Sequence, residues 1–220
     1  PGLQNVIICS DGYGWKERHG LLAGIPNKKV KIVGINGSLA KWDLVGSLSE
    51  KKRVMSTYLA NNPYKECLNY LPSRHRYYPP LLASTRTNPD FLEGYLEKPS
   101  FYLPTKDTNY SGIPREGCLV LDDYRNPLCA AISYCVKMGA KKIALFCCDE
   151  AFEDNRPGSE RMENGLFQYP QQIKSQKIVD AQFHWLRLKG IKVADCSSGI
   201  EYENAAYINP EGLESFFDAQ

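Results

Sequence analysis

Residues 126–149 read NPLCAAISYCVKMGAKKIALFCCD, a helix pattern followed directly by the pattern of a buried strand. Apolar side chains recur at helical spacing from Leu128 to Met138, and Gly139 suits the position just after a helix. Residues 142–148 then form a nearly continuous apolar run, which is typical of a strand buried on both faces of a parallel sheet. The segment therefore predicts the helix and the second strand of a βαβ unit.

Short apolar runs of the same kind recur along the chain. They lie at residues 5–9, 30–35, 54–60, 77–84, 101–103, 118–121 and 191–196. Strands that alternate with helix-like stretches form βαβ units, whose crossovers place helices against the sheet. The sequence therefore predicts an α/β fold of the Rossmann-like kind, with a mostly parallel sheet and helices on both faces.

A second clear helix is predicted at about residues 171–189. Its apolar stripe would consist of Ile178, Ala181, Trp185 and Leu188. We expect this stripe to pack against the sheet.

The chain is expected to form one domain over residues 1–220, with long polar loops at about 104–117 and 153–165. Its 27 basic and 25 acidic side chains give a net charge of +2 without any block of like charges, so no nucleic-acid arm is predicted. The short basic segment at residues 74–76 leaves a phosphate contact open. No apolar run approaches the ~20 residues that span a bilayer, and the first residues lack a signal-peptide pattern.

Eight cysteines are present, mostly within the predicted strands and helices. No C-x-x-C pair occurs, so we expect reduced thiols in the core rather than disulfides or a zinc site. Together these features predict a cytoplasmic protein without a membrane partner, and they leave oligomerisation open.

Polar and glycine residues follow the predicted strands, where open parallel sheets bind their ligands. The candidates for a nucleotide site are Asp11, Gly12, Gly14, Asn36, Gly37, Ser38, Asn61, Asn62 and Asn126. Glycine lets a ligand approach the backbone, and asparagine can both donate to and accept from a base or ribose. The alternative for each polar residue is helix capping, and for the glycines a plain tight turn.

Carboxylates after two further strands are candidates for chemistry. Asp122, Asp123, Asp149 and Glu150 could form one cluster. Asp149 with Asp122 could hold Mg²⁺ on a polyphosphate, while Asp149, Glu150 and Asp123 are the candidate catalytic groups. Arg156 and Arg161 follow in the second polar loop and could contact phosphate.

Four segments give the chain a family resemblance. They are residues 7–14, 33–38, 58–63 and 126–152. In order and pattern they resemble the domain family of archaeal 6-hydroxymethylpterin diphosphokinases, which is similar in fold to a family of bacterial sialyltransferases. The resemblance implies a nucleotide close to Gly12, Gly14, Asn36, Asn61 or Asn62, and Asn126.

The sequence departs from both families. Its first turn reads Ser-Asp-Gly-Tyr-Gly rather than Gly-x-Gly-Pro-Ser-Leu, and no histidine stands at residues 169–172, where the sialyltransferases place theirs. The leading hypothesis is a Mg²⁺-dependent transferase that uses a nucleotide such as ATP to phosphorylate or pyrophosphorylate a small hydroxyl-bearing acceptor. The alternatives are a sialyltransferase-like glycosyltransferase that uses a sugar nucleotide, and a non-catalytic binding or assembly module.

Overall fold

The computed structural model describes residues 4–25, 29–47, 55–72, 78–105, 118–149, 151, 154–197, 199 and 201–219. The predicted Glu150, the basic segment at residues 74–76 and most of the loop at 104–117 lie outside these residues.

Nine strands form one sheet in which every neighbouring pair is parallel. Its order is β11-β10-β7-β1-β2-β3-β4-β5-β6. The strands are β1 (Asn5–Cys9), β2 (Lys31–Ile35), β3 (Thr57–Ala60), β4 (Leu81–Ser84), β5 (Ser100–Pro104), β6 (Leu119–Leu121), β7 (Lys142–Phe146), β10 (Lys192–Asp195) and β11 (Ala206–Tyr207). The prediction of a Rossmann-like α/β fold is confirmed.

The strand order places a topological switch point beside β1. The chain builds outward from β1 to β6 and then returns to β7, which pairs with the free side of β1. Crevices at such points, outside the carboxyl ends of the strands, are where open α/β sheets bind ligands.

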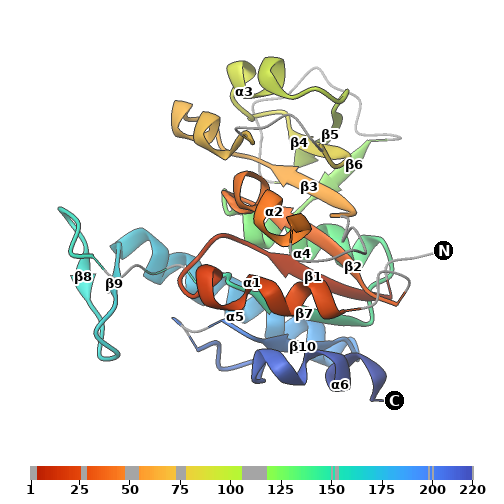
Figure 1. The fold of residues 1–220 in the computed structure, drawn as a ribbon, viewed down its shortest axis with the longest axis vertical. Coiled ribbons are helices and arrows are strands. Elements are labelled where there is room, and N and C mark those ends of the chain that lie inside the picture. The colour runs from red at the N-terminus through yellow and green to blue at the C-terminus, as the bar shows by residue number, and fades with distance from the viewer. Residues whose placement is uncertain are drawn as a thin grey trace.

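Helices cover both faces of the sheet (Figure 1). They are α1 (Trp15–Gly24), α2 (Ser38–Ser47), α3 (Pro89–Gly94), α4 (Pro127–Lys137), α5 (Pro170–Leu188) and α6 (Leu213–Asp218), with 3-10 turns η1 (Lys65–Tyr70) and η2 (Pro210–Gly212). Successive strand residues point to opposite faces of the sheet and so belong to two hydrophobic cores. Ile8 and Leu145 pack on the side of α4 and α5, whereas Ile7 and Phe146 pack on the side of α1.

Helix α4 begins where the sequence predicts. The Asn126 side chain accepts a hydrogen bond from the Leu128 N–H at 2.7 Å, and Gly139 has the left-handed φ of +87° that ends the helix. Met138 is exposed rather than buried, because it lies at the last turn.

Helix α5 is oriented differently from the prediction. Its buried side chains are Val179, Phe183 and Leu186, and the predicted stripe of Ile178, Ala181, Trp185 and Leu188 is exposed. The helix carries two apolar stripes, and periodicity alone does not decide which one faces the sheet.

The second polar loop contains strand β8 (Glu160–Arg161), which forms a short antiparallel hairpin with β9 (Phe167–Gln168) just after the loop. The hairpin projects on the left of Figure 1, the side of the carboxyl ends of the strands, and both chain ends lie on the right.

All eight cysteines are free thiols; seven are buried, as predicted, and Cys118 is exposed. None of the helices in the described part of the chain has both the length and the apolar content needed to cross a bilayer.

Candidate functional site

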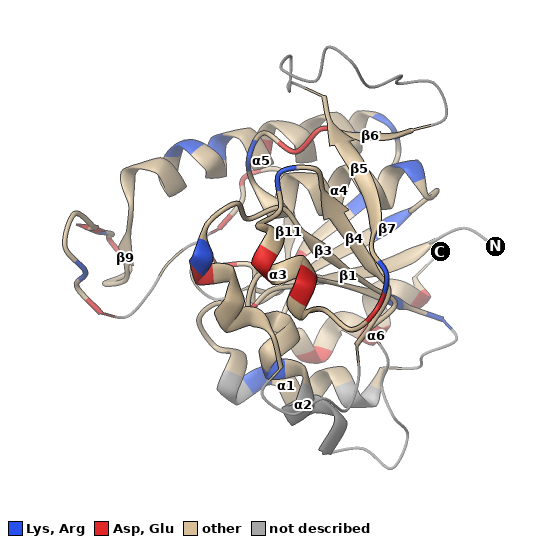
Figure 2. Ribbon diagram, turned by 90° about the horizontal axis from the view of Figure 1, so that it is seen from above, with Lys and Arg blue, Asp and Glu red and all other residues tan. Residues whose placement is uncertain are grey.

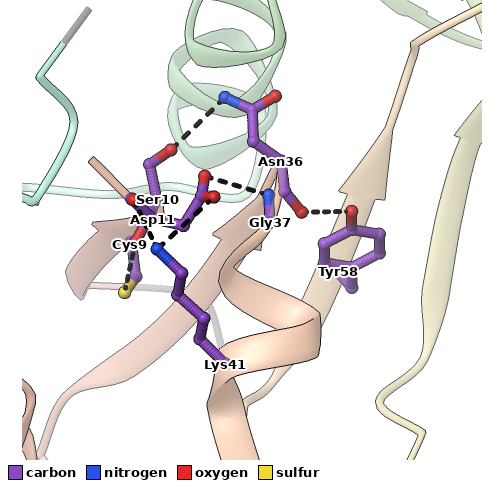
Figure 3. Close-up of polar contacts among 7 residues, drawn as sticks. All are labelled: Cys9, Ser10, Asp11, Asn36, Gly37, Lys41 and Tyr58. Atoms are coloured by element: carbon purple, nitrogen blue, oxygen red, sulfur yellow. Dashed lines mark hydrogen bonds and ion pairs between the residues drawn. The ribbon is translucent and has the colours of Figure 1, made fainter. Parts of the chain in front are cut away.

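The turns after β1 and β2 are locked together by polar contacts (Figure 3). The Asp11 carboxylate accepts a hydrogen bond from the Gly37 N–H at 3.0 Å. The Lys41 ammonium, on α2, donates to the Asp11 carbonyl at 2.9 Å and lies 3.7 Å from the Asp11 carboxylate. These contacts fix the two turns relative to each other at the carboxyl edge of the sheet.

Asn36 lies at the centre of this arrangement. Its backbone has a φ of +52°, a left-handed conformation that asparagine tolerates better than most residues. Its side-chain amide donates to the Ser10 hydroxyl at 3.3 Å, and its backbone carbonyl accepts from the Tyr58 hydroxyl at 2.6 Å. The Asn36 side chain therefore reaches the turn after β1, while Tyr58 on β3 holds its backbone.

Gly12 brings the β1 turn against the β7 turn. Its N–H donates to the Cys147 carbonyl at 2.9 Å, and a Cβ at this position would lie 2.6 Å from the same oxygen. Cys147 itself has a φ of +51°. Glycine is thus required at position 12 by the packing of the β1 turn against the β7 turn.

Two cations that sequence reasoning missed lie at the switch point. Arg18, on α1, donates to the Cys196 carbonyl after β10 at 2.9 Å. Burial raises the pKa of the Cys147 thiol, and the positive charges of Arg18 and Lys41 partly oppose this rise, so both cations act on the end of β7. Neither stands in a recognisable motif, because both come from helix positions that only the fold brings together.

A small pocket with about 10 Å³ of free space adjoins this site. It lies at the ends of β2 and β3 and reaches the first residue of α4. The residues that line it include the predicted Asn36, Asn61 and Asn62, together with Thr87 and Pro127. Three of the residues predicted to contact a nucleotide, Asn36, Asn61 and Asn62, line this one pocket.

Several predicted residues have clear structural partners. The Asn62 side chain accepts from the Tyr64 N–H at 2.8 Å, and Asn126 caps α4 while its amide donates to the Ser175 hydroxyl on α5. Gly14 has a φ of +81° at the start of α1, and Ser38 is fully buried at the start of α2.

The predicted carboxylate cluster does not form. β6 and β7 are consecutive along the chain but lie six strand spacings apart, about 29 Å at roughly 4.8 Å per strand. Asp122, after β6, and Asp149, after β7, are therefore too far apart to share one Mg²⁺ ion. Within the described residues no group of three His, Cys, Asp or Glu side chains is arranged to hold a metal.

Asp123 and Asp149 each have a partner within the protein. Asp123 is buried and forms an ion pair with Arg86 at 2.5 Å, at the far side of the sheet. Asp149 is buried and accepts a hydrogen bond from the Gly199 N–H, so it fastens the loop after β10. Arg156 and Arg161 are both exposed. Arg156 lies just before the β8–β9 hairpin, and Arg161 lies in β8.

Asp195, the last residue of β10, is a carboxylate that the sequence did not single out. It is 2% exposed, and its Oδ1 accepts from the Ser197 N–H at 2.9 Å. Burial raises the pKa of Asp195 to about 6. The residue lines a second pocket of about 690 Å³, including open space, with Glu201, Tyr202 and Tyr207. A buried carboxyl group with a pKa near neutrality at a pocket is a candidate proton acceptor.

No protein-family model matches the sequence, and no curated protein matches it. Among solved structures, the chain is similar to the MAf glycosyltransferase from Magnetospirillum magneticum AMB-1, with a TM-score of 0.70 and 13% sequence identity. The match covers 96% of this chain and 34% of the glycosyltransferase chain, so this chain spans about a third of that protein's length. At this identity the similarity concerns the fold.

Proposed function

We propose that this chain is a nucleotide-dependent transferase that transfers a glycosyl group from a sugar nucleotide to a hydroxyl-bearing acceptor. The observation that carries the proposal is the pair of cations, Arg18 and Lys41, at the switch point beside β1. A glycosyltransferase has a fold similar to this one, which supports the same class of chemistry.

The donor would bind across the ends of β1, β2 and β3. Its phosphate would lie near Arg18 and Lys41, where cations neutralise phosphate charge. Its nucleoside would lie over the ends of β2 and β3 beside Asn36 and Asn61, whose amides can both donate to and accept from a base or ribose.

Asp195 would act from the other side of the switch point. β10 lies two strand spacings from β1, about 10 Å. The Asp195 carboxylate would take the proton of the acceptor hydroxyl as its oxygen bonds to the anomeric carbon. The bond from that carbon to the donor phosphate oxygen breaks in the same step, and the nucleotide leaves with the electron pair.

Mg²⁺-dependent phosphoryl or pyrophosphoryl transfer from ATP is the competing function. A ligand screen separates the two, using thermal unfolding with CMP, UDP, sugar nucleotides, CTP, GTP and ATP, each with and without Mg²⁺. A ligand at 100 times its Kd stabilises by about 2.7 kcal/mol, which corresponds to a Tm rise of roughly 5 °C or more for a chain of this length. A Mg²⁺-independent rise with CMP, UDP or a sugar nucleotide is expected.

Variants of Arg18 and Lys41 test whether the nucleotide binds at the proposed site. Arg18→Gln and Lys41→Gln should each weaken nucleotide binding about tenfold or more, because each removes a charge-assisted contact to phosphate. Lys98→Gln is the matched control, since Lys98 is exposed and precedes β5 at the opposite edge of the sheet. A rise seen only with ATP and Mg²⁺ would favour phosphoryl transfer, and no rise with any nucleotide would favour a binding or assembly module.

A further inference from the structure

Helix α5 carries an apolar stripe that the described fold leaves uncovered. Ile178, Trp185 and Leu188 are 37%, 49% and 71% exposed, and Ala181 between them is exposed as well. The stripe runs from Ile178 to Leu188, ten steps along the helix or about 15 Å at 1.5 Å per residue. A contiguous apolar stripe on a helix surface differs from scattered exposed side chains, and such patches mark interaction sites.

The charges around this stripe have one sign. Lys174, Lys177 and Lys189 occupy the same outward side of the helix by its 3.6-residue period, and all three are exposed. The Lys189 ammonium lies 5.6 Å from the Trp185 ring centroid. Figure 2 shows the basic residues along α5 in blue.

The one acidic side chain of α5, Asp180, lies on the flank of the helix instead. Asp180 accepts two hydrogen bonds from Asn204, one from its N–H at 2.9 Å and one from its side-chain amide at 2.6 Å. Glu201 and Glu203 belong to the same loop, and both line the Asp195 pocket. On α5 itself, the outward side is therefore apolar and basic, because Asp180 faces the flank.

We propose that this outward side of α5 docks the protein onto an anionic lipid bilayer. Tryptophan and leucine insert at the interface between headgroups and acyl chains, and lysines beside them contact anionic headgroups. The expectation of no membrane partner rested on the lack of a spanning segment, which does not bear on a helix that lies in the plane of the interface. The proposal is independent of the proposed glycosyl transfer.

The test is co-sedimentation of the full chain with vesicles of phosphatidylcholine alone and with vesicles containing 30% phosphatidylglycerol. We expect binding to the anionic vesicles, loss of binding in high salt, and a blue shift of Trp185 fluorescence. Each lysine near an anionic surface should contribute about fivefold to the partition coefficient. Replacing all three lysines with glutamine should therefore lower it about 100-fold.

The apolar contribution is tested by the double variant Trp185→Ala with Leu188→Ala, which should bind more than tenfold more weakly. Leu96→Ala is the matched control, because Leu96 is 65% exposed between α3 and β5 and lies away from α5. All variants should keep the wild-type Tm, since the changed side chains are exposed. Absence of binding to anionic vesicles in low salt would overturn the proposal. So would a dimer, seen by light scattering, that the double variant dissociates, because the stripe would then bind a second copy of the chain.

Discussion

The buried carboxyl group of Asp195 makes the stability of this protein depend on pH in a predictable direction. The fold raises its pKa from an ordinary 3.8 to about 6, chiefly by burial and further by the negative charge of Glu201. The Ser197 N–H and the positive charge of Arg18 act in the opposite direction. Glu203, Tyr202 and Tyr207 line the same pocket.

The direction of this pH dependence follows from which state, folded or unfolded, binds the Asp195 proton more tightly. Between pH 4 and pH 6 the folded state holds the Asp195 proton more tightly than the unfolded state, so stability falls as the pH rises. The destabilisation is absent well below pH 4 and complete above pH 6. One pKa unit corresponds to about 1.36 kcal/mol, so the full effect is about 3 kcal/mol. About 2 kcal/mol of this develops between pH 4.5 and pH 7.5.

The perturbation is Asp195→Asn, which keeps the oxygen that accepts from Ser197 but cannot ionise. Urea unfolding of both proteins at several pH values gives the free energy of unfolding. The variant should gain about 2 kcal/mol relative to the wild type between pH 4.5 and pH 7.5, or roughly 4–8 °C in Tm. Asp154→Asn, at an exposed position, is the control for the amide substitution. If the two stability curves for wild type and Asp195→Asn run parallel across this range, the carboxyl group is not buried as described.

Three further predictions concern packing and thiols. Gly12→Ala should lower the free energy of unfolding by about 1–3 kcal/mol, because its Cβ would meet the β7 turn, whereas Gly212→Ala, with open space around it, should cost far less in the same denaturation assay. Asp123→Ala together with Arg86→Ala should be less destabilising than the sum of the single changes in a double-mutant cycle, because either change alone leaves a poorly solvated charge; additive effects would argue against the ion pair. Ellman's reagent should label Cys118 rapidly in the native protein and the other seven thiols only after unfolding; fast labelling of a second thiol would contradict the described burial.

The sequence predicts the parts of this fold that local chemistry specifies. Helix α4 and strand β7 lie where residues 126–149 place them, because a capping asparagine, an apolar period and a terminal glycine act within a few residues of one another. Asn36 and Asn61, which line the pocket, could be named from the sequence for a similar reason. Each follows a predicted strand, and parallel strands end at one edge of the sheet.

The sequence does not reveal the order of the strands in the sheet or the contacts between residues far apart along the chain. β6 and β7 follow each other along the chain, yet β7 pairs with β1, and this strand order separates Asp122 from Asp149. Arg18 was missed because its contact with the Cys196 carbonyl joins residues 178 positions apart. Asp195 reads as one polar residue at the end of an apolar run, and only its burial distinguishes it.

Backbone strain occurs at the same edge of the sheet as the proposed site. Within the described residues, the non-glycine residues with positive φ are Asn36, Tyr124, Arg125 and Cys147, and all of them follow the strands β2, β6 and β7. Such conformations cost of order 1–3 kcal/mol each and persist where the surrounding structure or function requires them. Asn36 and Cys147 stand on either side of the β1 turn, close to Lys41 and Arg18. Because the strain and the cations coincide at the switch point, a ligand that relies on both should bind there rather than at the more distant end of β6.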